Sequence, residues 1–186
     1  MKEAKAALRR EVKARIAALD GTYIAESDAG IMENVLSMPE FAAAGMVFAY
    51  LSVDRECDTR QIVEKLLAEG RHAALPRSRR GGAMDFALYD GALVEGLYGI
   101  PGPPEGAERV EPTPGDLMLV PALCCDRRGM RLGHGAGYYD RYLAGRRVFT
   151  ACLCRERLLM EKVPADWNDL AVACVITERG IIKTGL

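Results

Sequence analysis

The sequence predicts a single α/β domain with a mainly parallel central sheet and helices on both of its faces. Three observations lead to this prediction. Short apolar runs alternate along the chain with segments of helical periodicity, which is the pattern of strand–helix–strand units. The 186 residues suit one domain, so we assign residues 1–186 to it. Apolar residues make up 49% and charged residues 27% of the chain, which is the composition of a folded globular protein.

The first two elements are predicted to be helices. Near the start of the chain, apolar residues recur every three or four positions and share one face, and basic residues form a flank beside it. The apolar face consists of Leu8, Val12, Ile16 and Leu19, and the basic flank of Lys2, Lys5, Arg9 and Lys13. Asp20-Gly21 ends this helix, and a second helix over about residues 23–36 stops before Pro39.

Apolar runs then mark the strands. Residues 46–51 suit a buried strand, residues 59–68 have helical spacing, and residues 73–75 form the next short strand. This strand–helix–strand unit predicts parallel pairing. Further strands are predicted over residues 84–89, 116–123, 148–153 and 171–176, with a helix over residues 138–143. Residues 91–115, rich in glycine and proline, are predicted to form a long surface loop.

Charge and composition argue against several classes of protein. The formal net charge of −1 provides no global positive field for nucleic acid, so any anion site must be local. The six cysteines include no C-x-x-C pair, which favours buried reduced thiols over a metal or redox centre. The start is charged throughout, and no apolar run is long enough to span a membrane. We therefore expect a cytoplasmic protein that binds neither nucleic acid nor membranes.

The most informative segment is DRRGMRLGHGAGYYDR, residues 126–141, which follows a predicted strand. Its glycines at 133, 135 and 137 allow positive φ angles and open the backbone N–H groups to an anion, just before a predicted helix. Three arginines in the segment suit phosphate oxygens: Arg127, Arg128 and Arg131. Asp140 is a candidate ligand for Mg²⁺. These residues predict a phosphate-binding loop at the carboxyl end of a strand.

The glycine spacing alone leaves a second interpretation open, a tight turn between a strand and a helix that binds nothing. The Rossmann pattern would need a glycine at Tyr138, and the Gly-Lys-Ser/Thr sequence of a P-loop is missing. The surrounding arginines and Asp140 favour the phosphate-binding interpretation.

The pattern D-x-x-G-x-R-L-G-x-G-x-G-Y-Y-D, with the preceding V-P-A-L, resembles the signature of the 5-formyltetrahydrofolate cyclo-ligases, also called 5,10-methenyltetrahydrofolate synthetases. Three further segments follow the order found in that family. They are KAALR at residues 5–9, YLSVDRE at residues 50–56 and V-x-x-V-I-T-E-R-G at residues 172–180. The resemblance thus covers nearly the whole chain.

The resemblance implies an enzyme that uses ATP and Mg²⁺ to close 5-formyltetrahydrofolate into 5,10-methenyltetrahydrofolate, with release of ADP and phosphate, through phosphorylation of the formyl oxygen. The residues that it implies for charge neutralisation in catalysis are Arg131, Lys5 and Arg9. Those that it implies for ATP binding are Lys5, Arg9, Arg131, Leu132, Gly133, His134, Gly135, Ala136, Gly137, Tyr138 and Tyr139. It implies folate contacts from Leu51, Glu56 and Tyr139, and a magnesium contact from Asp140.

Taken without the resemblance, several of these residues have simpler interpretations. Lys5 and Arg9 would form a solvated helix flank, Leu51 would belong to the core, and Glu56 would be a solvated acid in a loop.

The chain also departs from the family pattern. Ala173 stands where an aspartate that contacts magnesium is expected, and Gly102 where glutamate is more frequent. Ala136 replaces a frequent glycine, which requires a negative φ at that position.

These departures keep a second function open, a cyclo-ligase-like paralogue that binds folate or a nucleotide with weak or no turnover. A nucleic-acid-binding module built on the basic helix and the arginines near residue 79 is a third interpretation, and the net charge disfavours it. We expect a monomer, whose folate could carry a polyglutamate tail near Arg79 and Arg80. The sequence leaves the oligomeric state, the preferred tail length and the selectivity among nucleotides open.

Overall fold

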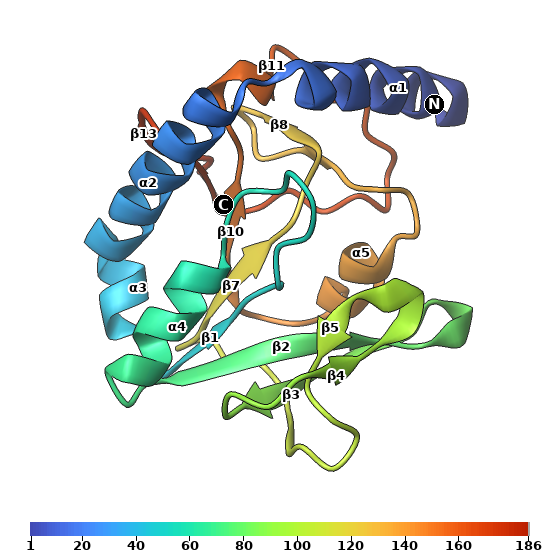
Figure 1. The fold of residues 1–186 in the computed structure, drawn as a ribbon. Helices are drawn as coiled ribbons and strands as arrows, with labels where there is room; N and C mark the ends of the chain where they lie inside the picture. The colour runs from blue at the N-terminus through green and yellow to red at the C-terminus, as the bar shows by residue number, and fades with distance from the viewer. Residues whose placement is uncertain (186) are drawn as a thin grey trace.

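The computed structural model describes residues 1–185, which form one large sheet with helices on both sides (Figure 1). The helices are α1 (Lys2–Ala18), α2 (Gly21–Ser37), α3 (Pro39–Ala43), α4 (Arg60–Ala68) and α5 (Tyr138–Leu143). Short 3-10 turns lie at Arg80–Gly82, Leu97–Gly99 and Glu156–Leu158. The strands of the large sheet are, in pairing order, β13 (Gly180–Lys183), β12 (Cys174–Thr177), β10 (Phe149–Leu153), β7 (Leu117–Val120), β1 (Met46–Phe48), β2 (His72–Ser78), β3 (Met84–Tyr89) and β6 (Arg109–Val110). The smaller sheets contain β11 (Leu159–Met160), β8 (Cys124–Asp126) and β9 (Arg131–Leu132), and β4 (Val94–Glu95) and β5 (Pro101–Gly102).

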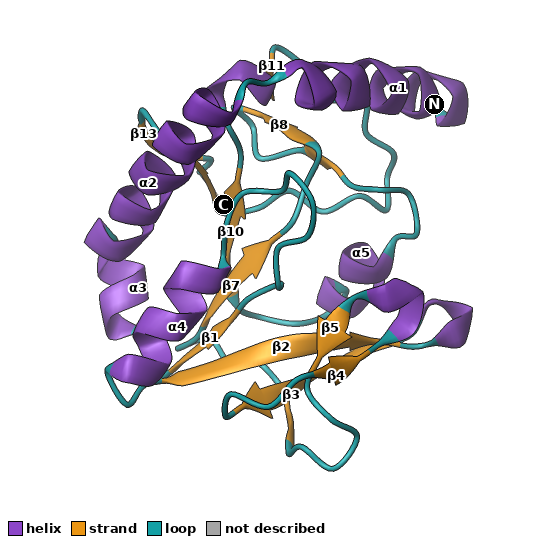
Figure 2. Cartoon of the chain, viewed as in Figure 1, coloured by secondary structure: helices purple, strands orange, loops and turns teal. Residues whose placement is uncertain are grey.

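The large sheet is parallel in its centre and antiparallel at its edges. β12, β10, β7, β1 and β2 pair in parallel, and Val47 of β1 lies between Ala73 of β2 and Leu117 of β7. β13, β3 and β6 are antiparallel to their neighbours. α4 connects β1 to β2, so the predicted strand–helix–strand unit is present. The predicted fold class, a mainly parallel sheet between helices, is confirmed (Figure 2).

The two faces of the sheet bury separate hydrophobic clusters. Successive side chains of a strand point to opposite faces, so Val47 packs with the cluster under α2, α3 and α4. Phe48 packs on the other face with the cluster that includes side chains of α1, α5 and β8. In β7, Leu117 packs with the first cluster and Met118 with the second. This alternation explains why the parallel strands are apolar throughout: both of their faces are covered.

The structure corrects several predicted boundaries. Residues 91–115 are not only a surface loop, because they contain the short strands β4, β5 and β6. The apolar run at 116–123 does not form one strand: β7 ends at Val120, Pro121 follows, and β8 and β9 form a separate small sheet. The strand predicted at 46–51 ends at Phe48, and the next residues turn toward a cavity. The sequence analysis also missed α3, β11 and β13.

The six cysteines are all buried and free in the part of the chain that the structure describes, as the sequence analysis expected. Among residues 1–185, no helix has the length and the apolar composition that crossing a bilayer requires.

A buried arginine joins α2 to the segment that follows β1. The side chain of Arg155 is only 1% exposed, and its Nη1 donates hydrogen bonds to Asp28 Oδ1 (2.6 Å) and to Ser27 Oγ (2.5 Å). Its Nη2 donates to the backbone oxygen of Glu56 (3.0 Å). A buried charge is tolerated only when such partners satisfy it. Arg155 therefore fixes the backbone at Glu56, one of the predicted folate contacts.

We expect Arg155→Met to lower the free energy of unfolding by about 3 kcal/mol, because it leaves Asp28 and several backbone oxygens without their buried cation. Urea unfolding with an unchanged m-value measures the loss. Arg109→Met is the matched control, since the ion pair of Arg109 with Glu111 is exposed and should contribute less than about 1 kcal/mol. Equal, small losses for both variants would contradict the structural role of Arg155.

Candidate active site

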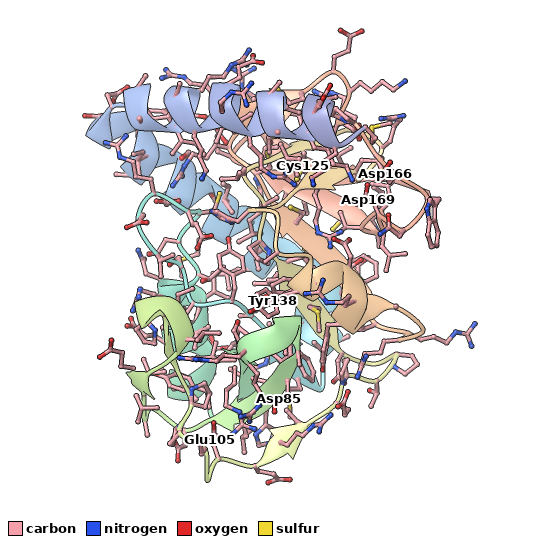
Figure 3. The ribbon with its side chains drawn as sticks, turned by 90° about the vertical axis from the view of Figure 1, so that its right-hand side faces the viewer. Asp85, Glu105, Cys125, Tyr138, Asp166 and Asp169 are labelled. Carbon is pink, nitrogen blue, oxygen red and sulfur yellow. The ribbon has the colours of Figure 1, made fainter. Side chains whose placement is uncertain are left out.

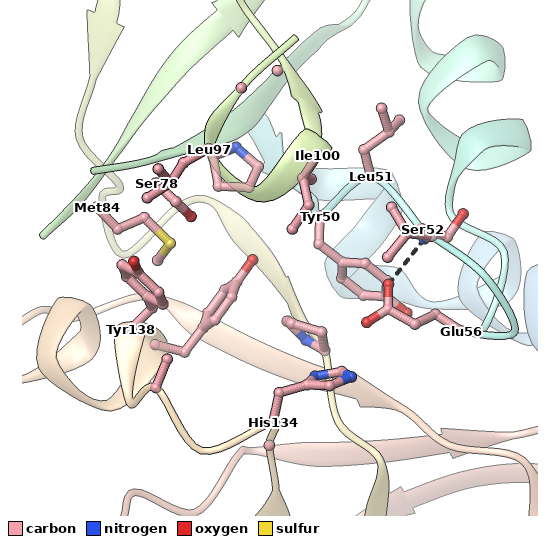
Figure 4. A pocket seen from close by; sticks show the side chains of 18 of the residues that line it. Tyr50, Leu51, Ser52, Glu56, Ser78, Met84, Leu97, Ile100, His134 and Tyr138 are labelled. Atoms are coloured by element: carbon pink, nitrogen blue, oxygen red, sulfur yellow. Dashed lines mark hydrogen bonds between the residues drawn. The ribbon is translucent and has the colours of Figure 1, made fainter. Parts of the chain in front are cut away.

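A cavity of about 1750 Å³ lies at the carboxyl edge of the central strands. Its walls come from α1, from the segments that follow β1, β2 and β7, from the hairpin of β4 and β5, and from the glycine-rich loop between β9 and α5 (Figure 4). The turn at residues 166–169 completes the rim. Ligands of α/β proteins bind at this edge of the sheet, because the loops that follow the parallel strands meet there.

The glycine-rich loop is held from two sides by arginines. Arg9 of α1 donates from Nε to the backbone oxygen of Gly133 (2.9 Å), and Arg141 of α5 donates from Nη2 to that of Ala136 (2.7 Å). Gly135 has a φ of 110° and lies against the Arg9 guanidinium, where a Cβ atom would be 3.4 Å from Arg9 Cζ. Gly137, with a φ of 67°, precedes the first residue of α5. Positive φ at these two positions fits the predicted use of glycine.

Arg131 is the buried centre of the cationic wall. Its side chain is 5% exposed, and Nη2 donates to Asp140 Oδ1 (2.8 Å) while Nη1 donates to the backbone oxygen of Leu170 (2.5 Å). The backbone N–H of Leu170 also points at Asp140 Oδ1, at 3.4 Å. Arg131 thus links the start of α5 to the segment that precedes β12.

Lys5 is fixed between two carboxylates on the same side of the cavity. Its Nζ lies 2.5 Å from Asp169 Oδ2 and 3.0 Å from Asp166 Oδ2, and its side chain is 14% exposed. Burial acts to lower the pKa of Lys5, but the hydrogen bonds and charges of the two aspartates outweigh it, so the pKa is raised. Lys5 is therefore a fixed cation at neutral pH. Figure 3 shows Asp166 and Asp169 close together beneath α1.

The opposite wall of the cavity is aromatic and apolar, with one acid. Tyr50 donates its hydroxyl to the backbone oxygen of Cys57 (3.0 Å), and Leu51 is buried beside it. Glu56 Oε2 accepts a hydrogen bond from the backbone N–H of Val53 at 3.0 Å (Figure 4). Burial raises the pKa of Glu56 above its usual value, and the charge of Asp54 adds to the shift while the bond from Val53 opposes it. Glu56 is therefore a partly buried acid in a loop rather than a fully solvated one.

Two side chains lie where these walls meet. The Tyr139 hydroxyl is buried without a hydrogen-bond partner, and burial raises its pKa well above the usual range, so it is a neutral donor. His134 also lines the cavity, and burial together with the nearby charges of Lys13 and Arg9 lowers its pKa.

The structure brings all the predicted site residues to this cavity. They are Lys5, Arg9, Leu51, Glu56, Arg131, Leu132, Gly133, His134, Gly135, Ala136, Gly137, Tyr138, Tyr139 and Asp140. Lys5 and Arg9 are thus not a merely solvated helix flank. The expectation that Arg127 and Arg128 help to bind phosphate is wrong, because neither lines the cavity and they pair instead with Glu156 and Asp126.

Sequence reasoning missed other residues that line the cavity. Arg141 lies directly after the glycine-rich motif, and that position was its only signal. Asp166 and Asp169 join Lys5 across most of the chain length, so no local pattern reveals them. The hairpin of β4 and β5, which the sequence predicts as part of a surface loop, covers one side of the cavity.

The structure explains two of the departures from the family pattern and places the third, Ala173, outside the main cavity. Gly102 lets β5 approach β2, because a Cβ atom there would lie 3.1 Å from the backbone oxygen of Pro76. Ala136 is not among the described residues with positive φ, so it meets the condition set for it. Ala173 lines a second, smaller cavity, whereas Asp140 lines the main one.

The acidic residues fit magnesium only in a limited way. Among the described residues, no cluster of three or more His, Cys, Asp or Glu side chains could enclose a metal ion. Asp140 offers one carboxylate at the cavity. Mg²⁺ often takes one or two carboxylates and completes its shell with phosphate oxygens and water. Asp140 therefore suits a magnesium ion that arrives with a phosphorylated ligand, and does not suit a site made by protein alone.

The fold and the cavity define a class of protein: an α/β domain with an arginine- and lysine-lined glycine loop opposite an aromatic wall. The chain belongs to the 5-formyltetrahydrofolate cyclo-ligase family, whose sequence profile matches residues 1–178. It is 35% identical over 148 residues to the 5-formyltetrahydrofolate cyclo-ligase of Mycolicibacterium smegmatis, covering 73% of this chain and 75% of the relative. The mouse protein of the same name is 28% identical over 94% of each chain.

A solved structure gives the same result for the fold. The 5,10-methenyltetrahydrofolate synthetase of Aquifex aeolicus, determined by NMR, superposes with a TM-score of 0.84 at 28% identity. The match covers 98% of this chain and 93% of that one. The family resemblance read from the sequence is therefore confirmed.

We expect Glu56→Gln to raise the free energy of unfolding at pH 7, because the folded protein must keep a charged carboxylate in a partly buried place. Because folding raises the pKa of Glu56, this residue does not destabilise the wild type below its unfolded-state pKa, near 4.3. As the pH rises through the higher folded-state pKa, the carboxyl group ionises in its partly buried place and the wild type loses stability. Urea unfolding between pH 4 and pH 8 measures the difference.

The control for this prediction is Glu64→Gln, on the exposed surface of α4, which should follow the wild-type pH dependence. A Glu56→Gln variant that is less stable than wild type at pH 7, or that shows the same pH dependence, would contradict the prediction.

Proposed function

We propose that this protein catalyses the ATP-dependent conversion of 5-formyltetrahydrofolate to 5,10-methenyltetrahydrofolate, with release of ADP and phosphate. The observation that carries the proposal is the pairing of two walls in one cavity. Lys5, Arg9 and Arg131 present fixed positive charge at the glycine-rich loop, and Glu56 lies with aromatic residues opposite them. The names of the relatives support the same reaction.

The cavity suits a reaction in which one ligand phosphorylates the other. The formyl oxygen attacks the γ-phosphorus of ATP, the bond to the β-γ bridging oxygen breaks, and ADP leaves. The product is a phosphorylated iminium, whose carbon the N10 amine then attacks. N10 loses its proton, the carbon–oxygen bond breaks, and phosphate departs with that electron pair. Such a transfer depends chiefly on positioning and on neutralisation of charge.

The cations have distinct places in this scheme. Lys5 and Arg9 come from α1 and would contact the phosphate chain, while the buried guanidinium of Arg131 would face the group in transfer. Because their partners already fix all three, little reorganisation is needed when charge moves from ATP to the formyl oxygen. Asp140 would hold magnesium, which supplies further charge neutralisation on the phosphates when it is bound.

The opposite wall would bind the pterin ring. A carboxylate such as that of Glu56 can accept hydrogen bonds from the pterin N–H groups, and Tyr50 and Leu51 offer aromatic and apolar contact. The Tyr139 hydroxyl, which has no hydrogen-bond partner among the described residues, can donate to a carbonyl oxygen of the folate.

The proposal extends to the setting of the enzyme. We propose a cytoplasmic monomer that acts on folates with or without a polyglutamate tail and does not involve nucleic acid or a membrane. The arginines suggested for the tail offer little support, because neither Arg79 nor Arg80 lines the cavity and Arg79 is engaged by Asp85 and Glu105. The nearby Arg77 lines the cavity, but it also pairs with Asp85.

We expect purified protein with magnesium, ATP and 5-formyltetrahydrofolate to form the methenyl product, followed by its near-ultraviolet absorbance. Arg131→Ala should lower kcat/KM by about 100-fold or more, because it removes a fixed cation from the site of phosphoryl transfer. Arg127→Ala is the matched control and should keep wild-type activity, since Arg127 lies outside the cavity.

Circular dichroism and the Arg131→Lys variant separate loss of catalysis from loss of fold. If wild-type protein binds folate or ATP in a calorimeter yet forms no product, the proposed turnover is wrong. The alternative of a paralogue that binds without turnover would then hold.

A further inference from the structure

We propose that Trp167 stacks against the base of the bound nucleotide and thereby contributes to ATP affinity. This inference rests on the proposed function, because it requires that the triphosphate binds at Lys5, Arg9 and Arg131.

Trp167 is unusual in its exposure. It is the only tryptophan of the sequence, and 96% of its surface is accessible to solvent. Among the described residues, the other exposed large apolar side chains reach at most 58%. An aromatic ring of this size gains free energy when a flat partner covers it, so its position in the structure favours a ligand contact.

Two hydrogen bonds close the turn that carries Trp167. Residues 166–169 form a turn in which the N–H of Asp169 donates to the backbone oxygen of Asp166 (3.2 Å). In return, the N–H of Asp166 donates to Asp169 Oδ2 (2.5 Å). Trp167 occupies the second position of this turn, which leaves its side chain free while its backbone is fixed on both sides.

The same turn is attached to the cations of the proposed phosphate site. Both of its aspartates bind Lys5, and the next residue, Leu170, accepts a hydrogen bond from Arg131. The turn residues on either side of Trp167, Asp166 and Asn168, line the main cavity. Trp167 itself does not line the cavity, so its ring stands just outside it, beside the turn that holds Lys5. The proposal places the base of the bound nucleotide against this ring.

The other aromatic side chains that the structure describes at the cavity are more buried than Trp167. Tyr50 and Tyr138 donate their hydroxyls to the backbone oxygens of Cys57 and Arg79, and the hydroxyl of Tyr139 is buried. Among the described aromatic rings near the cavity, Trp167 is the most exposed. Stacking of a base on an aromatic side chain typically changes affinity by about 5-fold to 100-fold when the ring is replaced by alanine.

The test uses the full-length protein and the emission of its single tryptophan, excited where tyrosine does not absorb. Titration with MgATP in the absence of folate should quench and shift the emission. Inorganic tripolyphosphate, which carries the phosphates without a base, should leave the emission unchanged while it occupies the same cations. Calorimetry in parallel measures the binding of both ligands.

Kinetics provide an independent measurement. Trp167→Ala should raise KM for ATP about tenfold, with kcat and the KM for 5-formyltetrahydrofolate within about twofold of wild type. Trp167→Phe, which keeps a smaller ring, should recover most of the loss.

Three results would overturn the inference. Unchanged emission at a calorimetrically saturating ATP concentration, or an equal change with tripolyphosphate, would refute stacking while the cyclo-ligase proposal stands. Equal KM values for ATP in Trp167→Ala and wild type would do the same. Absence of ATP binding in the calorimeter would refute both proposals together.

Discussion

The active site depends on the burial of one guanidinium, that of Arg131. A charge with only 5% exposure must be satisfied from all sides, and Asp140 and the carbonyl oxygen of Leu170 supply its partners. Arg131 lies in β9, Asp140 in α5, and Leu170 in the segment that precedes β12. Because the buried guanidinium needs both partners, it holds these three parts of the chain together. Asp169, next to Leu170, then binds Lys5 and ties α1 to the same point.

This arrangement gathers cations at one place in a nearly neutral chain and pairs two of them with carboxylates: Lys5 with Asp166 and Asp169, and Arg131 with Asp140. The cations of the loop are held by backbone oxygens and by carboxylates, and the parallel sheet supplies the edge on which they meet. The opposite wall lowers the stability of the fold at neutral pH, because Glu56 must keep a charged carboxylate in a partly buried position. Arg155 holds the backbone oxygen of Glu56, so this wall depends on a second buried arginine. Under the proposed function, stability and function conflict at Glu56 and support each other at Arg155 and Arg131.

The sequence was sufficient for the layers of the fold and for the glycine-rich loop, because both produce local patterns. Continuous apolar runs indicated β1, β7, β10 and β12, and the spacing of apolar residues indicated the helices. The sequence could not predict the strands β4 and β5, because two-residue strands have no detectable periodicity. Residue chemistry alone could not separate Arg131 from Arg127 and Arg128, and only the family motif singled out Arg131. The structure excludes Arg127 and Arg128 because neither lines the cavity. The pair of Lys5 with Asp169 joins residues 164 positions apart and is a property of the fold alone.

We propose that the two walls of the cavity bring the formyl oxygen to the γ-phosphoryl group of ATP. The most direct test is to supply 5-formyltetrahydrofolate labelled with ¹⁸O in the formyl group and to analyse the released phosphate by mass spectrometry. Phosphorylation of the formyl oxygen predicts one labelled oxygen in each phosphate released. Unlabelled phosphate, with product formed at the normal rate, would contradict the claim and would place ATP hydrolysis apart from the ring closure.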